Sequence, residues 1–346
     1  MVPSSVWMVV SHLDYTTRAS VMTINGFAYY ANKAGHYSSY ADLVSHVSGG
    51  VIKPTTKFSI RQFMCSESYV VIDGDGFHLF LSIPAILRSI LGRRTVFFSV
   101  RTESFAGASL KSIVKRALSK LIHYAPKMSL VSIHRRSPGL HSYARGIYID
   151  DPQLWDLRFL EFRESCPPEL VNVYAGTSHM PILLVAGQLN EKRSLKELVS
   201  NADLLAKKFR LVFAGAIRDL NIQRYLSSLS NVYSVNRYVT DDELVFLLKN
   251  SDLVYAYYSQ EINRPSGIFG RSVQCGTPVL VRAGGYLERS YPELRHCLIS
   301  VRALPEVHPG LLRNQKEQAF MHAAKSSEFT GVAEIRFALG LPGLID

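Results

Sequence analysis

The chain has 346 residues, which is long for one domain and suits two domains of about 150–180 residues each. Hydrophobic residues make up 47% and charged residues 19%, so a globally disordered chain is excluded. The net charge of +11 indicates an anionic partner, and nucleic acid, an anionic membrane surface or a phosphate-bearing substrate all fit it.

The cysteines and the apolar runs bear on where the protein works. Cys65, Cys166, Cys275 and Cys297 form no CxxC pair and no Cys/His cluster, which argues against a zinc site and against a disulfide framework. We expect buried, inert thiols in a reducing compartment. No apolar run approaches the ~20 residues that cross a bilayer, and the first residues lack the pattern of a signal peptide. We therefore expect a cytoplasmic protein without a spanning helix.

The N-terminal half alternates short apolar runs with helical patterns. The run at 69–72 ends in Asp73-Gly-Asp-Gly76, which is typical of a buried parallel strand followed by a turn. Pro84 is expected early in the next helix, because proline fits a first helical turn. In chain order we expect a strand at 6–10, a helix at 19–33, a strand at 69–72, a helix at 79–91, a strand at 95–100, a helix at 109–123 and a strand at 130–133.

The C-terminal half shows a clearer succession of strands and helices. Ser194-Leu-Lys-Glu197 and Thr240-Asp-Asp-Glu243 have the spacing of capping boxes, in which the first and fourth residues satisfy each other's backbone N–H groups. In chain order we expect a strand at 181–186, a helix from 194 with Leu195, Leu198, Val199, Ala202 and Leu205 on one face, strands at 210–214 and 232–235, a helix at 240–249, a strand at 253–257, a helix after Gly267 and a strand at 279–281.

This alternation predicts an α/β fold with two Rossmann-like, doubly wound domains, each a parallel sheet covered by helices on both faces. The segment from 150 to 168 is rich in turn formers and aromatic residues, so we place the connection between the domains there. The expected domains are residues 1–165 and 166–346, with the option that the last helix packs back on the N-terminal domain.

Four segments of the second half carry a resemblance to a known family. A glycine loop runs from Gly187 to Ser194, and the 210–214 strand ends at Gly215. The segment 237–244 comes next, and the region 261–278 closes with Cys-Gly-Thr-Pro before a glycine pair. In this order the segments resemble those of the family-4-like, retaining glycosyltransferases of GT-B fold, over about residues 181–288.

The resemblance implies a donor site in the C-terminal domain and an acceptor site in the N-terminal domain, facing each other across a cleft. Glycine permits close backbone approach, and a helix start offers N–H groups to a phosphate. The residues assigned to the diphosphate and nucleotide are Gly187, Lys192, Arg193, Gly215, Tyr238, Val239, Ser266 and Gly267.

The catalytic candidates depart from the family pattern. Two glutamates eight positions apart precede the Cys-Gly-x-Pro turn in that family, and these positions are Asn263 and Arg271 here. Arg271 has no acceptor atom for ribose hydroxyls but can clamp a phosphate. Glu261, two residues from the sugar-facing position, takes that role in our assignment. Arg101 follows the 95–100 strand where the family often has a cleft histidine, so it is the acceptor-side candidate.

The helix at 109–123 has a basic amphipathic pattern that allows two interpretations. Lys111, Lys115, Arg116 and Lys120 lie opposite an apolar stripe. Such a helix can lie on an anionic membrane, whereas a surface helix with its apolar face in the core is the commoner case. Nearby basic residues keep the membrane interpretation open, namely Arg88, Arg93, Arg94, Arg135 and Arg136.

The expected activity is transfer of a sugar from a UDP- or GDP-sugar to a saccharide or lipid-linked saccharide acceptor, in polysaccharide or glycolipid biosynthesis. Cations and N–H groups would meet the charge of the leaving diphosphate, so neither a metal nor another cofactor is expected. The alternatives are a catalytically silent GT-B scaffold that binds saccharide or a partner enzyme, and a sugar-nucleotide epimerase of the same fold. Nucleic-acid binding is not expected, because no helix-turn-helix, RNP or zinc-finger pattern occurs.

Overall fold

The computed structural model describes residues 26–31, 37–72, 74–100, 105, 107–133, 146–176, 178–190, 194–263, 265–323 and 331–342. The strand expected at 6–10 lies outside these residues. Within them, no helix is both long enough and apolar enough to cross a membrane.

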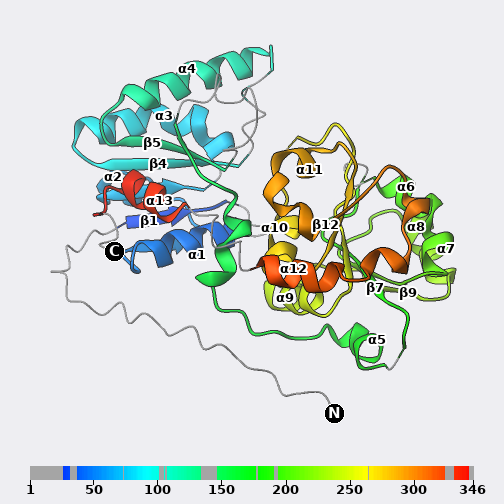
Figure 1. The fold of residues 1–346 in the computed structure, drawn as a ribbon. Helices are drawn as coiled ribbons and strands as arrows, with labels where there is room; N and C mark the ends of the chain where they lie inside the picture. Colours follow the sequence, from blue (N-terminus) through cyan, green and yellow to red (C-terminus); the bar gives the residue numbers. More distant parts are fainter. Residues whose placement is uncertain are drawn as a thin grey trace.

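The first half of the chain forms a six-stranded parallel sheet in the order β2-β1-β3-β4-β5-β6. Helices α3 and α4 cover one face and α1 covers the other (Figure 1). The strands are β1 (Gly26–Tyr29), β2 (Ile52–Thr55), β3 (Ser68–Val71), β4 (Arg94–Ser99), β5 (Met128–Ser132) and β6 (Ile147–Tyr148), and the helices are α1 (Tyr37–Val47), α2 (Ile60–Cys65), α3 (Gly74–Ile90) and α4 (Leu110–Tyr124).

The second half forms another six-stranded parallel sheet, in the order β12-β11-β10-β7-β8-β9. Its strands are β7 (Ile182–Ala186), β8 (Arg210–Ala214), β9 (Val232–Val235), β10 (Leu253–Tyr255), β11 (Val279–Arg282) and β12 (Leu298–Val301). Its helices are α5 (Val171–Ala175), α6 (Leu195–Ser200), α7 (Ala202–Ala206), α8 (Leu220–Ser228), α9 (Asp241–Lys249), α10 (Gly267–Gln274), α11 (Tyr286–Ser290) and α12 (Gln315–Ala323).

The order of the second sheet reverses between β7 and β10. The chain runs outward from β7 to β9 and then returns to build β10 to β12 on the other side. Ligands of doubly wound sheets bind at such a switch point, outside the carboxyl ends of the strands. The loops that follow β7, β8, β10 and β11 therefore mark where a site is expected.

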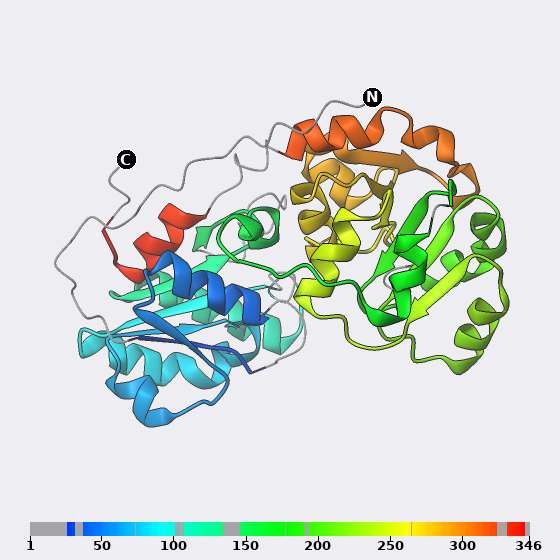
Figure 2. The ribbon, with the colours of Figure 1, turned by 90° about the horizontal axis from the view of Figure 1, so that it is seen from below.

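Helix α13 (Val332–Leu339) packs against the first sheet although it comes last in the chain. It contacts β4, β5, β6 and α1, and Ile335 is buried in the same apolar cluster as Leu43 and Val44. Figure 2 shows α13 and α1 side by side on one face of the sheet.

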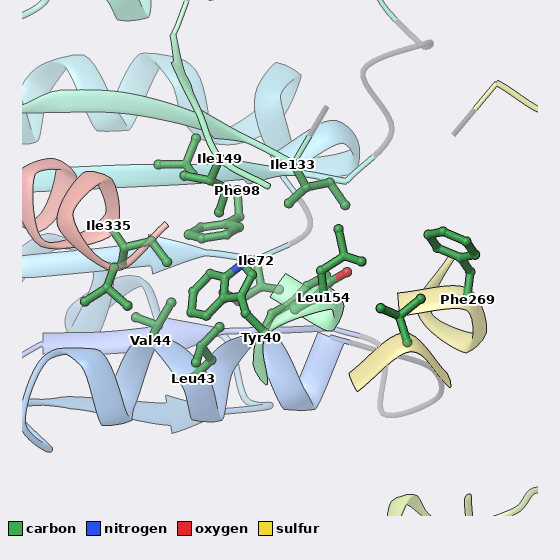
Figure 3. Close-up of a cluster of buried hydrophobic side chains, with 14 of the residues drawn as sticks. Tyr40, Leu43, Val44, Ile72, Phe98, Ile133, Ile149, Leu154, Phe269 and Ile335 are labelled. Carbon is green, nitrogen blue, oxygen red and sulfur yellow. The ribbon is translucent and has the colours of Figure 1, made fainter. Parts of the chain in front are cut away.

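The segment between the sheets is part of a shared core. Leu154 and Trp155 are buried together with residues of both domains. Figure 3 shows Ile133 and Leu154 on the side of this cluster where Phe269 of α10 lies. A Cβ added at Gly270 would stand 2.6 Å from the Gln153 carbonyl oxygen, so α10 rests directly on the connecting segment.

Several predicted elements are corrected by the structure. The helix expected over 19–33 is wrong for residues 26–29, which form β1 between β2 and β3. Gly26 suits this place, because a Cβ there would lie 2.9 Å from the Ser68 carbonyl oxygen. Helix α3 begins at Gly74 rather than at 79, which puts Pro84 inside the helix and not in its first turn.

The expectation of buried thiols is also corrected. Cys297 is buried, whereas Cys65 is exposed and both Cys166 and Cys275 are partly exposed. Cys275 nevertheless packs against an apolar cluster, and this partial burial raises its pKa to about 12, so the thiol stays protonated at neutral pH.

Candidate functional site

Two glycines at the switch point bring the ends of β7 and β8 into direct backbone contact. Gly187 has φ 90° and Gly215 has φ 147°, backbone conformations that favour glycine. The Gly187 N–H donates to the Ala214 carbonyl oxygen at 2.8 Å. A Cβ on Gly215 would lie 2.1 Å from the Gly187 carbonyl oxygen. The two predicted glycines thus form one structural unit at the carboxyl edge of the sheet.

Arg282 joins the loops that follow β7 and β10. Its Nε donates to the Tyr258 carbonyl oxygen at 2.9 Å, and its Nη2 donates to Ser194 Oγ at 3.2 Å. The guanidinium carbon lies 3.9 Å from the centre of the Tyr257 ring, a cation–π contact. The Tyr258 hydroxyl is 2.6 Å from Ser266 Oγ, which caps α10 by accepting from the Phe269 N–H. One connected set of polar contacts therefore links Ser194, Arg282, Tyr258 and Ser266.

The contacts of Arg282 overturn the capping box predicted at 194–197. Ser194 precedes α6 with φ 51° and makes no side-chain cap hydrogen bond. Glu197 accepts instead from Arg282 Nη2 at 2.5 Å. The physical reason is that a nearby guanidinium offers the carboxylate a charge-assisted bond, which is stronger than a bond to a backbone N–H.

The segment after β9 is held by a different ion-pair network. Arg237 donates to both oxygens of Glu243 and to both oxygens of Glu169. Thr240 and Glu243 form the predicted capping box of α9, which is confirmed. Within this segment Tyr238 is exposed, while Val239 packs against the apolar cluster under α9.

Acid is expected to weaken this segment. The hydrogen bonds from Arg237, together with those from Thr240, lower the pKa of Glu243 from 4.5 to about 2. A lowered folded-state pKa gives stability that is present above pH 4.5 and is lost as the pH falls toward 2. Glu243→Gln should therefore lower the free energy of unfolding at pH 7 by about 1–3 kcal/mol and flatten its decline between pH 5 and pH 3. Urea unfolding across this range measures both effects, and Glu317→Gln, exposed on α12, serves as the control.

Arg271 does not belong to the polar contacts that link Ser194 to Ser266. It lies in a buried contact between the domains. It is fully buried, donates to Asp156 at 2.9 and 3.1 Å and to Asp241 at 2.8 Å, and also reaches Ser39 of α1 at 3.1 Å. Burial lowers the pKa of Arg271, but the two carboxylates more than offset this and raise it above its ordinary value. Two aspartates already balance this charge, so the structure corrects the assignment of Arg271 as a phosphate clamp.

Of the remaining candidates, two lie in the described part of the chain and three do not. Glu261 lies in the loop after β10, where it is exposed and its N–H donates to Ser259 Oγ at 3.3 Å. Gly267 is the first residue of α10 and is buried. Three predicted residues, Lys192, Arg193 and Arg101, lie outside the described residues.

Two residues of this edge were missed in the sequence. Arg282 is the last residue of β11, and Asn236 follows β9, where its Oδ1 accepts from the Ile217 N–H at 2.7 Å. Both positions come directly after predicted apolar strands. A search for polar residues at the carboxyl ends of all strands, rather than within the family segments alone, finds both.

Comparisons with known proteins agree with this architecture. Neither the protein-family models nor the curated proteins give a match. Among solved structures, WaaG, a glycosyltransferase involved in lipopolysaccharide biosynthesis, aligns over 91% of this chain and 99% of its own with a TM-score of 0.55 and 13% identity. Anabaena HepE in complex with UDP-glucose aligns over 91% and 98% with a TM-score of 0.58 and 11% identity, and its complex with UDP gives 0.59 and 12% over the same shares.

The two parallel sheets and these alignments show that the chain has the GT-B fold. The predicted fold class, two Rossmann-like domains, is confirmed. The assignment to family 4 within that fold stays a prediction.

Proposed function

We propose that the protein transfers a sugar from a nucleoside-diphosphate sugar to a saccharide acceptor. The observation that carries this proposal is the contact between Gly187 and Gly215 at the switch point, beside the loop end that Arg282 holds at Ser194. Close backbone approach is a feature that a pyrophosphate needs, and Arg282, itself paired with Glu197, fixes the loop beside it. The HepE complex with UDP-glucose, a protein of the same fold, supports a UDP-sugar as the donor to test first.

In this proposal the protein stabilises the leaving group. Negative charge grows on the diphosphate as the glycosidic bond breaks, and Lys192, Arg193 and backbone N–H groups would meet it without a metal or other cofactor.

The other site residues are assigned to parts of the substrates. The Ser266–Gly267 start of α10 would face the phosphates, and Tyr238 and Val239 would face the base. Glu261 is assigned to the donor sugar and Arg101 to the acceptor.

The proposal has finer parts that rest on the family resemblance and on charge. Retention of the anomeric configuration is one, and the configuration of the product by NMR tests it. A lipid-linked acceptor in polysaccharide or glycolipid synthesis is another, and it accords with the involvement of WaaG in lipopolysaccharide biosynthesis. A third finer part is the location of the protein, which we propose to be the cytoplasm, with peripheral contact at the inner face of an anionic membrane.

Thermal-shift measurements with UDP, GDP and their sugars test the donor site. A ligand that binds only the folded protein at about 100 times its Kd adds about 2.7 kcal/mol of stability, which corresponds to a rise in Tm of several degrees. Stabilisation by one nucleotide, followed by transfer from its sugar, is the expected result. No stabilisation by any member of the panel would remove the proposal.

Arg282→Gln is expected to reduce that stabilisation. The guanidinium joins the Tyr258 carbonyl to Ser194, so its loss releases the end of the glycine loop. We expect nucleotide affinity to fall about 10–100-fold, the range for losing a charge-assisted contact. The Kd from thermal shift or calorimetry measures this. Arg224→Gln on α8, also an arginine but exposed, should leave the Kd unchanged, and an unchanged Kd for Arg282→Gln would contradict the role.

A catalytically silent scaffold is the second candidate. It is favoured by one observation, the burial of Arg271 between two aspartates at a position where the family has a glutamate. This candidate predicts nucleotide binding without transfer to any acceptor and without donor hydrolysis. The same panel of nucleotide sugars therefore separates the two functions.

A further inference from the structure

Helix α4 turns its apolar side away from the protein. Leu110 is 77% exposed and Tyr124 70% exposed, and Ile113, Val114 and Leu121 are exposed as well. The opposite side, which faces the domain, carries Ser112, Lys115, Ser119 and Ile122, all buried. The alternative interpretation of this helix, in which its apolar stripe packs into the core, is therefore wrong.

Specific contacts hold this inverted orientation. Ser119 is fully buried, and Ser109 caps the start of the helix by accepting from the Ser112 N–H at 3.2 Å. Arg116 donates to the carbonyl oxygens of Phe105 at 2.7 Å and Gly107 at 2.8 Å. Rotating the apolar stripe inward would expose Ser119 and break the bonds of Arg116 to Phe105 and Gly107, so these contacts favour the outward face.

Helix α3, which packs beside α4, also exposes apolar side chains. Both helices lie on one face of the first sheet and contact each other (Figure 1). We call their outward side the α3–α4 surface, formed by the exposed residues Ile83, Leu87, Ile90, Leu91, Leu110, Ile113, Val114, Leu121 and Tyr124. Exposed apolar patches of this kind mark sites of interaction with proteins or membranes.

The positive charge of the chain is concentrated in the same region. Residues 76–149 contain 12 of the 39 lysines and arginines and only one of the 28 acidic residues, Glu103. The remaining 27 basic and 27 acidic residues cancel, so this segment accounts for the whole net charge of +11. Eight of these twelve basic residues belong to the part of the chain that the structure describes, and they lie on or soon after α3 and α4.

Exposed lysines lie beside the apolar stripe. Lys111 follows Leu110 and Lys120 precedes Leu121, so each is about 100° around the helix from the stripe, on opposite flanks. Lys127 is exposed just after the helix. Three other basic residues face the protein instead: Arg88 is buried, Arg93 donates to the Met64 carbonyl, and Arg94 donates to the Ala338 carbonyl.

We propose that the α3–α4 surface docks on an anionic lipid bilayer, with the apolar stripe in the acyl-chain boundary and the flanking lysines at the headgroups. An apolar stripe edged by lysines is the pattern of helices that lie in a membrane interface. A second copy of this chain fits less well, since two surfaces of like charge repel, and nucleic acid offers no partner for nine exposed apolar side chains. The proposal names a partner for the acceptor-side domain and rests on the proposed function only for its purpose, access to a lipid-linked acceptor.

Flotation of the full-length protein with liposomes tests the proposal. Vesicles of phosphatidylcholine alone are compared with vesicles containing phosphatidylglycerol, and the wild type should float with the anionic ones. Lys111→Gln with Lys120→Gln should weaken the apparent affinity about 30-fold, since each basic residue near an anionic surface contributes about a factor of five. Ile90→Gln with Leu110→Gln should weaken it at least about tenfold.

Matched variants serve as controls. Lys53→Gln with Lys57→Gln removes the same charge from exposed positions around β2, and Phe337→Gln removes an equally exposed apolar side chain from α13; both should float like the wild type. Equal flotation of wild type and α3–α4 variants, no flotation of the wild type, or a dimer dispersed by Leu110→Gln would each overturn the proposal. Nucleotide stabilisation, measured on the same proteins, should be unchanged by the α3–α4 variants, so failure of the donor site and failure of membrane docking are told apart.

Discussion

Arg271→Met is expected to lower the free energy of unfolding by about 3–5 kcal/mol, as removal of one partner from a buried ion pair does. The substitution leaves the Asp156 carboxylate, which is 1% exposed, without the guanidinium that donates to it twice. Asp241 is 30% exposed and can gain water, so the larger part of the loss comes from Asp156. Urea unfolding of the full-length protein measures the change.

A double-mutant cycle shows whether the loss belongs to this pair. Arg271→Met combined with Asp156→Asn should cost about 1–3 kcal/mol less than the sum of the single variants, because the second change removes the unpaired charge. Arg224→Met, at an exposed position on α8, should change stability by less than about 0.5 kcal/mol. Additive losses in the cycle would show that Arg271 acts through packing and not through charge.

Gly215→Ala should remove about 3 kcal/mol of stability and most nucleotide binding. The added Cβ would stand 2.1 Å from the Gly187 carbonyl oxygen and 2.7 Å from its carbonyl carbon, which are backbone atoms and cannot rotate away. The φ of 147° adds backbone strain, and overpacking and strain each cost about 1–3 kcal/mol. Urea unfolding and thermal shift with UDP measure the two effects.

Gly49→Ala is the control that separates backbone strain from the steric clash expected in Gly215→Ala. Gly49 also has a positive φ, of 67°, but a Cβ there would meet nothing within 4 Å. We expect a loss of only about 1 kcal/mol, from the left-handed backbone alone, and an unchanged nucleotide response. Equal losses for the two variants would contradict the close contact of the two strand ends.

The burial of Arg271 ties α10 to Asp156 of the connecting segment and to Asp241 of α9. The position that carries a glutamate in the resembling family points here to α1 and to the connecting segment, where Gln274 also donates to the Gln153 carbonyl oxygen at 2.6 Å. Helix α10 is therefore attached to both domains. Its start, at Ser266, stays within the polar contacts of the switch point.

Local sequence patterns were sufficient for most of the second domain. The strands at 181–186, 210–214, 232–235 and 279–281 match β7, β8, β9 and β11 within one residue at each end. Buried parallel strands are continuous apolar runs that end in glycine or polar turns, and this signal is local. The capping box at Thr240 was predicted for the same reason, since all of its bonds lie within four residues.

The failures have a common cause, which is partners that are distant in the sequence. Gly26–Tyr29 is a strand because it lies between β2 and β3. Ser194 does not cap α6, and its hydroxyl accepts instead from Arg282, 88 residues away. Neither outcome is visible in a short window, because tertiary contacts override local preference.

By itself the sequence determined the doubly wound fold class, the glycines at the strand ends, and the concentration of positive charge between residues 76 and 149. Only the tertiary structure decided which way the amphipathic helix at 110–124 faces and where Arg271 finds its carboxylates. Periodicity shows that a helix has two unlike sides, but the side that is buried depends on what the neighbouring elements offer it. Here Ser112 and Ser119 are buried, Arg116 is bonded to the segment that precedes α4, and the apolar side lies outward.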